Sequence, residues 1–208
     1  MTKERMESFS DGIFAFAITL LVLGIQVPDL KLPNDSLLAS ALLQAAPQLI
    51  PYITSFATIG VIWLNHHSMF HNVEKVTHTT LSLNLLLLLV IAFIPFPTAV
   101  LGRYGPMGSA VLLYGATFSA LGLSYNLLWL HILRNRLSRD CRDEDHAKSH
   151  TMRNLLGSLI YPAATAIAFV APRISLTIFF VLAGFYFIPG LRPAPTSPEA
   201  FDGAYKSN

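Results

Sequence analysis

Ser10 and Asp11 are polar side chains that stand just before an apolar segment, which starts near Ile13. A carboxylate at the edge of an apolar helix is costly unless it is paired or faces water. Asp11 could simply cap the helix, since a negative charge suits the positive end of the helix dipole. The alternative is that Ser10 and Asp11 belong to a buried polar network with partners on other helices.

A second set of residues has the spacing of metal ligands. His67 and His71 are four residues apart, and Glu74 follows on the same helical face, with His66 beside them. No further ligand is evident, so we expect no metal site.

Serine, histidine and aspartate are all present in the chain, but they do not lie in a nucleophile motif, and the sequence has no glycine-rich phosphate-binding loop. We therefore expect that the protein is not an enzyme and has no cofactor.

The apolar segment has one regular stripe. At about 100° per residue, one side of a helix over this segment carries Phe9, Phe16, Leu20, Leu23 and Val27. Thr19 lies beside this stripe, and Asp11 points nearly the opposite way. Such a stripe could line a pore, but periodicity alone favours an ordinary face toward lipid or another helix.

The composition indicates a lipid environment. Hydrophobic residues make up 53% of the 208 residues and charged residues only 12%, where a soluble domain carries about 25% charged residues. The mean hydropathy of +0.52 agrees. The net charge of +2 is too small to indicate binding to nucleic acid. The single cysteine, Cys141, excludes a disulfide within the chain, and we expect a reduced thiol facing the cytosol.

We predict an all-α integral membrane protein with six transmembrane helices, since a spanning helix needs about 20 mostly apolar residues. The predicted spans are 6–27, 47–66, 81–101, 107–133, 155–170 and 174–188. Pro172 forces a tight turn between the last two, because proline cannot continue the hydrogen bonding of a helix. Those two spans are short, so they could instead form a re-entrant hairpin. The membrane domain covers 1–190, and the proline-containing segment 191–208 is expected to be a disordered cytoplasmic tail.

The basic residues predict the orientation of the chain. With these six spans, eleven of the 14 lysines and arginines fall on the same side as the N-terminus. The other three are Lys31, Arg103 and Arg173. The positive-inside rule then predicts a multi-pass protein of the cell membrane with both termini in the cytoplasm. The first apolar segment has no signal-peptide cleavage site, so we expect it to stay in the mature protein.

The start of the chain resembles a known family. The motif Arg5-x-x-x-Phe9-Ser10-Asp11 and the apolar residues after it are similar to the signature of the transmembrane protein 175 potassium channel family. That family includes lysosomal channels and their prokaryotic relatives. A looser similarity continues through the segments 63–67 and 93–98.

The resemblance implies a potassium-selective cation channel that conducts passively. Prokaryotic members carry one six-helix repeat per chain and assemble as tetramers, so it implies a homotetramer in membrane lipid. The first helix of each chain lines the pore. The family lacks the Thr-Val-Gly-Tyr-Gly filter of ordinary potassium channels, and this chain lacks it too.

The resemblance also assigns roles along the pore. Phe16 takes the position of the main constriction, where isoleucine or leucine is more usual, and Leu20 and Leu23 follow one and two turns later. Thr19 takes the position that is associated with selectivity. An apolar ring that is narrow enough excludes water and gates by dewetting.

A polar network behind the pore is implied as well. In it, Trp63 and a neighbouring histidine, either His66 or His67, bond to the group of Ser10 and Asp11. Asn84 could join this network, and Arg5 is expected to supply its cation.

Two other functions compete with the channel. In a proton-coupled secondary transporter, Asp11 and His66 or His67 would form a proton relay. Prolines interrupt the second and third spans, as in transporters with broken helices, but no repeat symmetry is visible. The other function is a proton-permeable leak through the same pore.

Overall fold

The computed structural model describes residues 2–31, 34–138 and 158–187. The predicted tail 191–208, most of the polar loop before the fifth span, and Cys141 lie outside the described residues. Within the described ranges the backbone forms helices, and its one extended pairing is an isolated bridge between Val73 and Ser138. The prediction of an all-α fold is confirmed.

The first helix, α1 (Lys3–Leu20), starts at a capping threonine, because the hydroxyl of Thr2 accepts a hydrogen bond of 3.4 Å from the backbone N–H of Arg5. It ends in a 3-10 turn, η1 (Leu21–Gly24). A Cβ atom placed on Gly24 would lie 2.9 Å from the Cβ of Ala99, so glycine allows this turn to rest against the helix Pro95–Tyr104.

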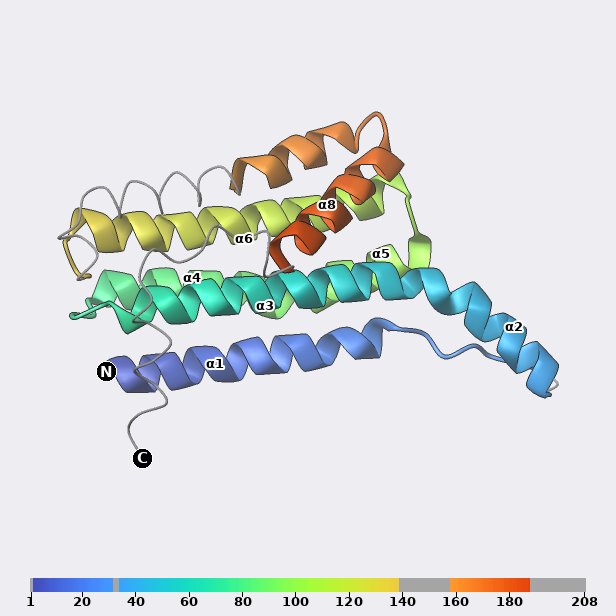
Figure 1. The fold of residues 1–208 in the computed structure, drawn as a ribbon, viewed down its shortest axis with the longest axis horizontal. Helices are drawn as coiled ribbons and strands as arrows, with labels where there is room; N and C mark the ends of the chain where they lie inside the picture. Colours follow the sequence, from blue (N-terminus) through green and yellow to red (C-terminus); the bar gives the residue numbers. More distant parts are fainter. Residues whose placement is uncertain (1, 32–33, 139–157, 188–208) are drawn as a thin grey trace.

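The second span is longer than predicted. It consists of α2 (Asp35–Ala45), the 3-10 turn η2 (Ala46–Gln48) and α3 (Leu49–His71), of which α3 corresponds to the predicted span 47–66. Pro47 lies in η2, where its missing N–H weakens the helical hydrogen bonding. Figure 1 shows α2 bending away from the line of α3 and projecting beyond the end of α1. None of the residues of α2 is buried in this chain.

The third span is broken in the middle. It comprises α4 (His78–Phe93) and α5 (Pro95–Tyr104), where the sequence predicted one helix over 81–101. Pro95 and Pro97 cannot donate backbone hydrogen bonds, which explains the break at Ile94. Gly105 ends α5 with a positive φ of 62°, a conformation that side chains rarely adopt.

The last three helices pack through small residues. The long α6 (Gly108–Arg134) contacts the helix Ser158–Ile167 through Gly115, Ser119 and Gly122. A Cβ atom on Gly115 would lie 2.3 Å from the hydroxyl oxygen of Thr165, so only glycine permits this close approach. The final helix, α8 (Pro172–Phe187), begins at the predicted proline, which suits a first helical turn.

Four helical stretches of the described chain are long and apolar enough to span a membrane. They are Lys3–Gly24, Asp35–His71, His78–Tyr104 and Gly108–Arg134. The helices in the last two predicted spans are shorter, and the 16 residues of α8 reach about 24 Å at 1.5 Å per residue. All six predicted spans therefore contain a helix, and in the last two the described helical residues alone are fewer than the about 20 that a full bilayer crossing needs.

The helices run back and forth along the long axis of the bundle, with α1 along one edge (Figure 1). The basic residues of the described chain consequently separate to the two ends. At the end of the bundle with the N-terminus, Figure 1 shows the start of α1, the turn between α3 and α4, and the end of α6; these segments carry Lys3, Arg5, Lys75, Arg134 and Arg136. At the opposite end it shows the segment before α2, the end of α5 and the start of α8, which carry Lys31, Arg103 and Arg173. These two groups of basic residues are the ones that the predicted spans place on opposite sides of the membrane.

Candidate ion pathway along the first helix

The helix α1 has a buried face that fixes how it sits in the bundle. At intervals of three or four residues, this face carries Met6, Ser10, Phe14, Ala17 and Leu21, all at most 1% exposed. They pack against α3, α4 and α5. Burial of these side chains stabilises α1 in one rotation about its axis, because any other rotation would expose them and bury the opposite face.

The other side of α1 carries the predicted stripe only as far as Leu20. The predicted span 6–27 is shorter in the structure, since Leu23 lies in η1 and Val27 lies beyond the helical residues. Phe16 and Leu23 are 62% and 75% exposed, and Phe9 and Val27 are exposed as well. Leu20 is half-buried at the edge of the stripe. An exposed apolar stripe of this kind must be covered by lipid or by further chains, since the protein's own core lies on the other side of the helix.

Thr19 is exposed next to this stripe. Its hydroxyl donates a hydrogen bond of 2.8 Å to the backbone carbonyl of Phe16, one turn earlier. The donor of the hydroxyl is therefore used within the helix, and the lone pairs of its oxygen remain directed outward. Because the hydroxyl proton points to the carbonyl of Phe16, the oxygen of Thr19 can accept a hydrogen bond or coordinate a cation through its lone pairs.

A buried polar network joins α1 to α3 and α4. The amide nitrogen of Asn84 donates to the hydroxyl of Ser10 over 2.9 Å, and that hydroxyl donates to the carbonyl of Met6 over 2.8 Å. The amide oxygen of Asn84 lies 2.8 Å from Nε2 of His66. Because an amide oxygen can only accept, Nε2 of His66 carries the proton. The aromatic rings of Phe14 and Phe70 flank this imidazole, at centroid distances of 5.4 and 4.6 Å.

Asp11 belongs to a separate contact nearer the surface. The indole N–H of Trp63 on α3 donates to the carboxylate of Asp11 over 2.8 Å. The ring of His67 lies 6.1 Å from that of Trp63 and is exposed. The structure thus decides between the two histidines, since His66 points into the network with Ser10 and His67 points outward. Both contacts hold α1 from the side away from the stripe.

The expected pairing of Arg5 with Asp11 is not formed within one chain. Six residues separate them on a continuous helix, which places them about 9 Å apart along its axis and on different sides. In the part of the chain that the structure describes, the one ion pair is Lys3 with Glu7, at 4.0 Å. Lys3 also donates to the carbonyl of His71 over 3.1 Å and so ties the start of α1 to the end of α3.

A second buried cluster was not predicted from the sequence. The hydroxyl of Ser55 lies 2.8 Å from that of Thr98 and 3.0 Å from that of Tyr114, and all three residues are buried. The cluster links α3, α5 and α6 at the end of the bundle opposite the N-terminus. Serine and threonine are common on transmembrane helices, and no spacing in the sequence indicates that these three residues meet.

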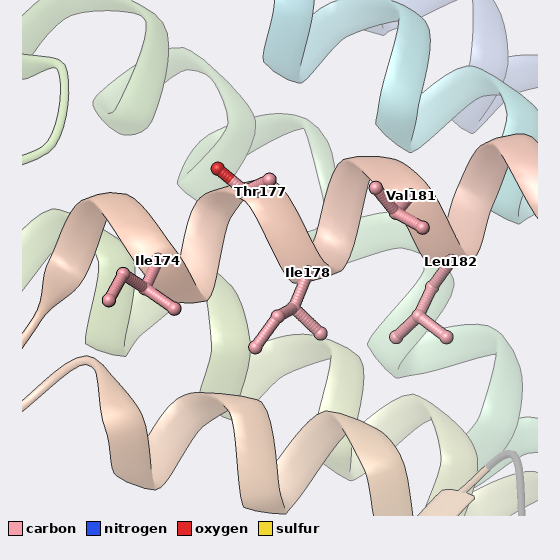
Figure 2. A pocket seen from close by; sticks show the side chains of 5 residues that line it. All are labelled: Ile174, Thr177, Ile178, Val181 and Leu182. Carbon is pink, nitrogen blue, oxygen red and sulfur yellow. The ribbon is translucent and has the colours of Figure 1, made fainter.

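The described residues offer no group of three candidate metal ligands, and His66 and His67 face different surroundings. A hollow of about 330 Å³ lies along α8 (Figure 2). Its lining is aliphatic except for one hydroxyl, and it consists of Ile174, Thr177, Ile178, Val181 and Leu182. Such a lining cannot replace the hydration shell of an ion, so α1 remains the better candidate for an ion pathway.

Comparison with known proteins identifies relatives of the whole chain. The family model described as the endosomal/lysosomal potassium channel TMEM175 matches residues 5–95. A potassium channel of Chamaesiphon minutus is 39% identical over 186 residues, which cover 88% of this chain and 92% of that protein.

Two further comparisons concern structure and a mammalian relative. The crystal structure of a lysosomal potassium-selective channel TMEM175 homolog from Chamaesiphon minutus matches with a TM-score of 0.79 and 37% identity, covering 88% of this chain and 95% of that one. The endosomal/lysosomal proton channel TMEM175 of Mus musculus is 43% identical over 101 residues, which are 46% of this chain and 20% of the mouse protein.

Proposed function

The chain belongs to the TMEM175 family of channels, and from this premise we propose that it conducts potassium ions passively through a pore built by several copies around α1. The observation that carries the proposal is the exposed stripe of α1, which faces away from the core of its own chain. One helix cannot enclose a pore, so copies must meet with these stripes at a common axis. The function is transport without catalysis.

We infer that the assembly is a homotetramer in the cell membrane, with both termini in the cytoplasm. We infer four chains because this chain resembles the prokaryotic members of the family, which carry one repeat per chain and assemble as tetramers. The exposed helix α2 supports association between copies, because it is rich in leucine and buries nothing in its own chain. The separation of basic residues to the two ends of the bundle supports the orientation.

The stripe would act as a hydrophobic gate. The α-helix rises about 6 Å from Phe16 to Leu20 at 1.5 Å per residue, and the 3-10 turn adds about 6 Å up to Leu23 at about 2 Å per residue. Apolar side chains from each copy would exclude water over this length when the helices are close together, and a hydrated ion could not pass. The pore would conduct when the helices separate enough for water to enter.

Selectivity would depend on Thr19. Its oxygen lone pairs point away from the core, beside the stripe. One such oxygen from each copy could replace part of the hydration shell of a potassium ion next to the constriction. No charged side chain of the described α1 lies between Asp11 and Leu20, so the site would favour a weakly hydrated cation rather than bind it tightly.

The polar network would have a structural role. Asn84 holds Ser10, and Trp63 holds Asp11, from the side of α1 that is turned away from the stripe. These two contacts fix the rotation of α1 and so determine which side chains reach the pore axis. Asp11 would therefore not bind the permeating ion.

Proton permeation is the second candidate, because the mouse relative is named a proton channel. The buried imidazole of His66 favours it, since in the network with Asn84 and Ser10 it is the group that can take up and release a proton. A proton-coupled transporter is the third candidate and would use Asp11 and a histidine as its relay. In the structure, however, His66 is bonded to Asn84 and Asp11 to Trp63, so the two are not in contact with each other.

Flux through the purified protein in liposomes separates these functions. A potassium channel should give a reversal potential that follows the potassium gradient alone, with little effect of an imposed pH gradient. A reversal potential that follows the pH gradient would support the proton leak, and coupling of the two gradients would support the transporter.

Native mass spectrometry of the same sample tests the assembly. It should show four chains, and a stable monomer would contradict the proposed pore.

A further inference from the structure

A cavity of about 300 Å³ lies at the end of the bundle opposite the N-terminus, between α3, α5, α6 and α8. No residue of α1 lines it, so it is separate from the proposed ion pathway. Its volume is at the lower end of the range of about 300–1,000 Å³ for small-molecule sites. It is partly open, which allows a ligand to enter from the side or end of the bundle.

The inner wall of the cavity is apolar. Leu101, Leu176 and Phe179 contribute carbon surface from α5 and α8. Tyr114 also lines the cavity, but its hydroxyl is bonded to Ser55 over 3.0 Å. The hydroxyl of Thr54 donates to the carbonyl of Ile50 over 2.8 Å. The polar groups of the wall are thus already satisfied, and the interior suits a hydrocarbon chain.

The outer rim of the cavity carries a positive charge. Arg173, the second residue of α8, lines the cavity and is exposed. Within the described ranges no carboxylate lies within ion-pair distance of its guanidinium. Gly105 and Pro106, which join α5 to α6, lie on the same rim. This rim is at the end of the apolar helices, which is the depth at which lipid headgroups meet the hydrocarbon core.

We propose that this cavity binds one acyl chain of an anionic phospholipid whose phosphate lies on Arg173. The hydrocarbon would contact Leu101, Leu176 and Phe179, and the phosphate would accept hydrogen bonds from the guanidinium, whose planar fork suits that group. The lipid would brace the first turns of α8 against α3 and α5. The inference rests on the membrane location of the chain and does not require ion conduction.

Native mass spectrometry with added lipid tests this proposal. The purified full-length protein is titrated with phosphatidylglycerol and, separately, with phosphatidylcholine, and the lipid retained per chain is counted. We expect one phosphatidylglycerol per chain and preferential retention over phosphatidylcholine. Arg173→Gln should weaken phosphatidylglycerol retention by about tenfold, since a charge-assisted hydrogen bond is lost.

Arg103→Gln is the matched control, because Arg103 lies in the last turn of α5, two positions before the lining residue Gly105, but does not itself line the cavity. It should leave lipid retention unchanged. Leu176→Trp should fill the cavity and reduce retention of both lipids. Ile50→Phe, at another part of the lining, provides a second filling variant if the first does not fold.

Equal losses in Arg173→Gln and Arg103→Gln would refute the assignment of the phosphate to Arg173. Full lipid retention in a folded cavity-filling variant would refute the cavity as the site. A long-chain fatty acid that displaces phosphatidylglycerol at equal concentration would refute a phospholipid as the occupant. A protein that retains the lipid but carries no ions would refute the proposed channel and leave this inference standing.

Discussion

Truncation of Phe16 is the most direct test of the proposed pore. The ring is 62% exposed in the single chain, so Phe16→Ala removes few contacts within its own subunit. Phe14, two residues earlier, is only 1% exposed. Phe14→Ala should therefore cost about 3–5 kcal/mol of folding free energy, as buried aromatic truncations do, while Phe16→Ala should cost much less.

The expected effect of Phe16→Ala is on conduction. Replacing each ring by a methyl group widens the narrowest part of the proposed gate and allows water to enter. If the dry gate supplies only about 1.4 kcal/mol of the barrier, its loss raises the flux about tenfold. Leu20 and Leu23 would remain and keep part of the dry zone, so we expect a raised basal flux with weaker discrimination between ions.

The assay is potassium and sodium flux in liposomes at matched protein density, with thermal unfolding measured on the same preparations. Phe16→Leu is the conservative control and should conduct with selectivity near that of the unmodified protein. Phe16→Asn should also raise flux, because a polar ring admits water without much widening. Unchanged flux and selectivity in a folded Phe16→Ala tetramer would refute the reasoning and make the stripe a lipid-facing surface.

Three further substitutions test the selectivity site, the network and the helix packing. Thr19→Val should reduce the preference for potassium over sodium while flux persists, and an unchanged permeability ratio would assign selectivity elsewhere. Asn84→Ala should lower stability by about 1–3 kcal/mol, seen as a lower Tm, because His66 and Ser10 lose buried partners. Gly115→Val should reduce the yield of folded protein, since its side chain would overlap Thr165; a normal yield and Tm would show that the helix Ser158–Ile167 can shift.

Local features of the sequence were enough to predict the fold class and most of the elements. Few charges and long apolar segments require lipid, and apolar length alone located the six helical segments. The stripe is a property of helical periodicity, so the shared side of Phe9, Phe16 and Leu20 on α1 could be predicted as well. The end of the α-helix at Leu20, before Leu23 and Val27, was not predicted. The roles of Phe16 and Thr19 came from family resemblance and remain predictions.

Other features depended on contacts between residues far apart in the chain. His66 and His67 are chemically identical neighbours, and only the packing of α3 against α1 and α4 decides that His66 meets Asn84. Trp63 bonds to Asp11, as the family resemblance implied, whereas the cation that was expected from Arg5 is not paired with this carboxylate in the chain. The expected pairing of Arg5 with Asp11 was wrong, because the geometry of a continuous helix keeps the two side chains apart.

The break at Ile94 and the protruding α2 were not predicted, although prolines mark both places in the sequence. Proline weakens a helix, but whether the helix then bends or continues depends on what packs against it. The cavity beside Arg173 has the same origin, since its walls come from four different helices, α3, α5, α6 and α8. Apolar content and periodicity are set residue by residue, whereas partners and cavities exist only once the helices have packed.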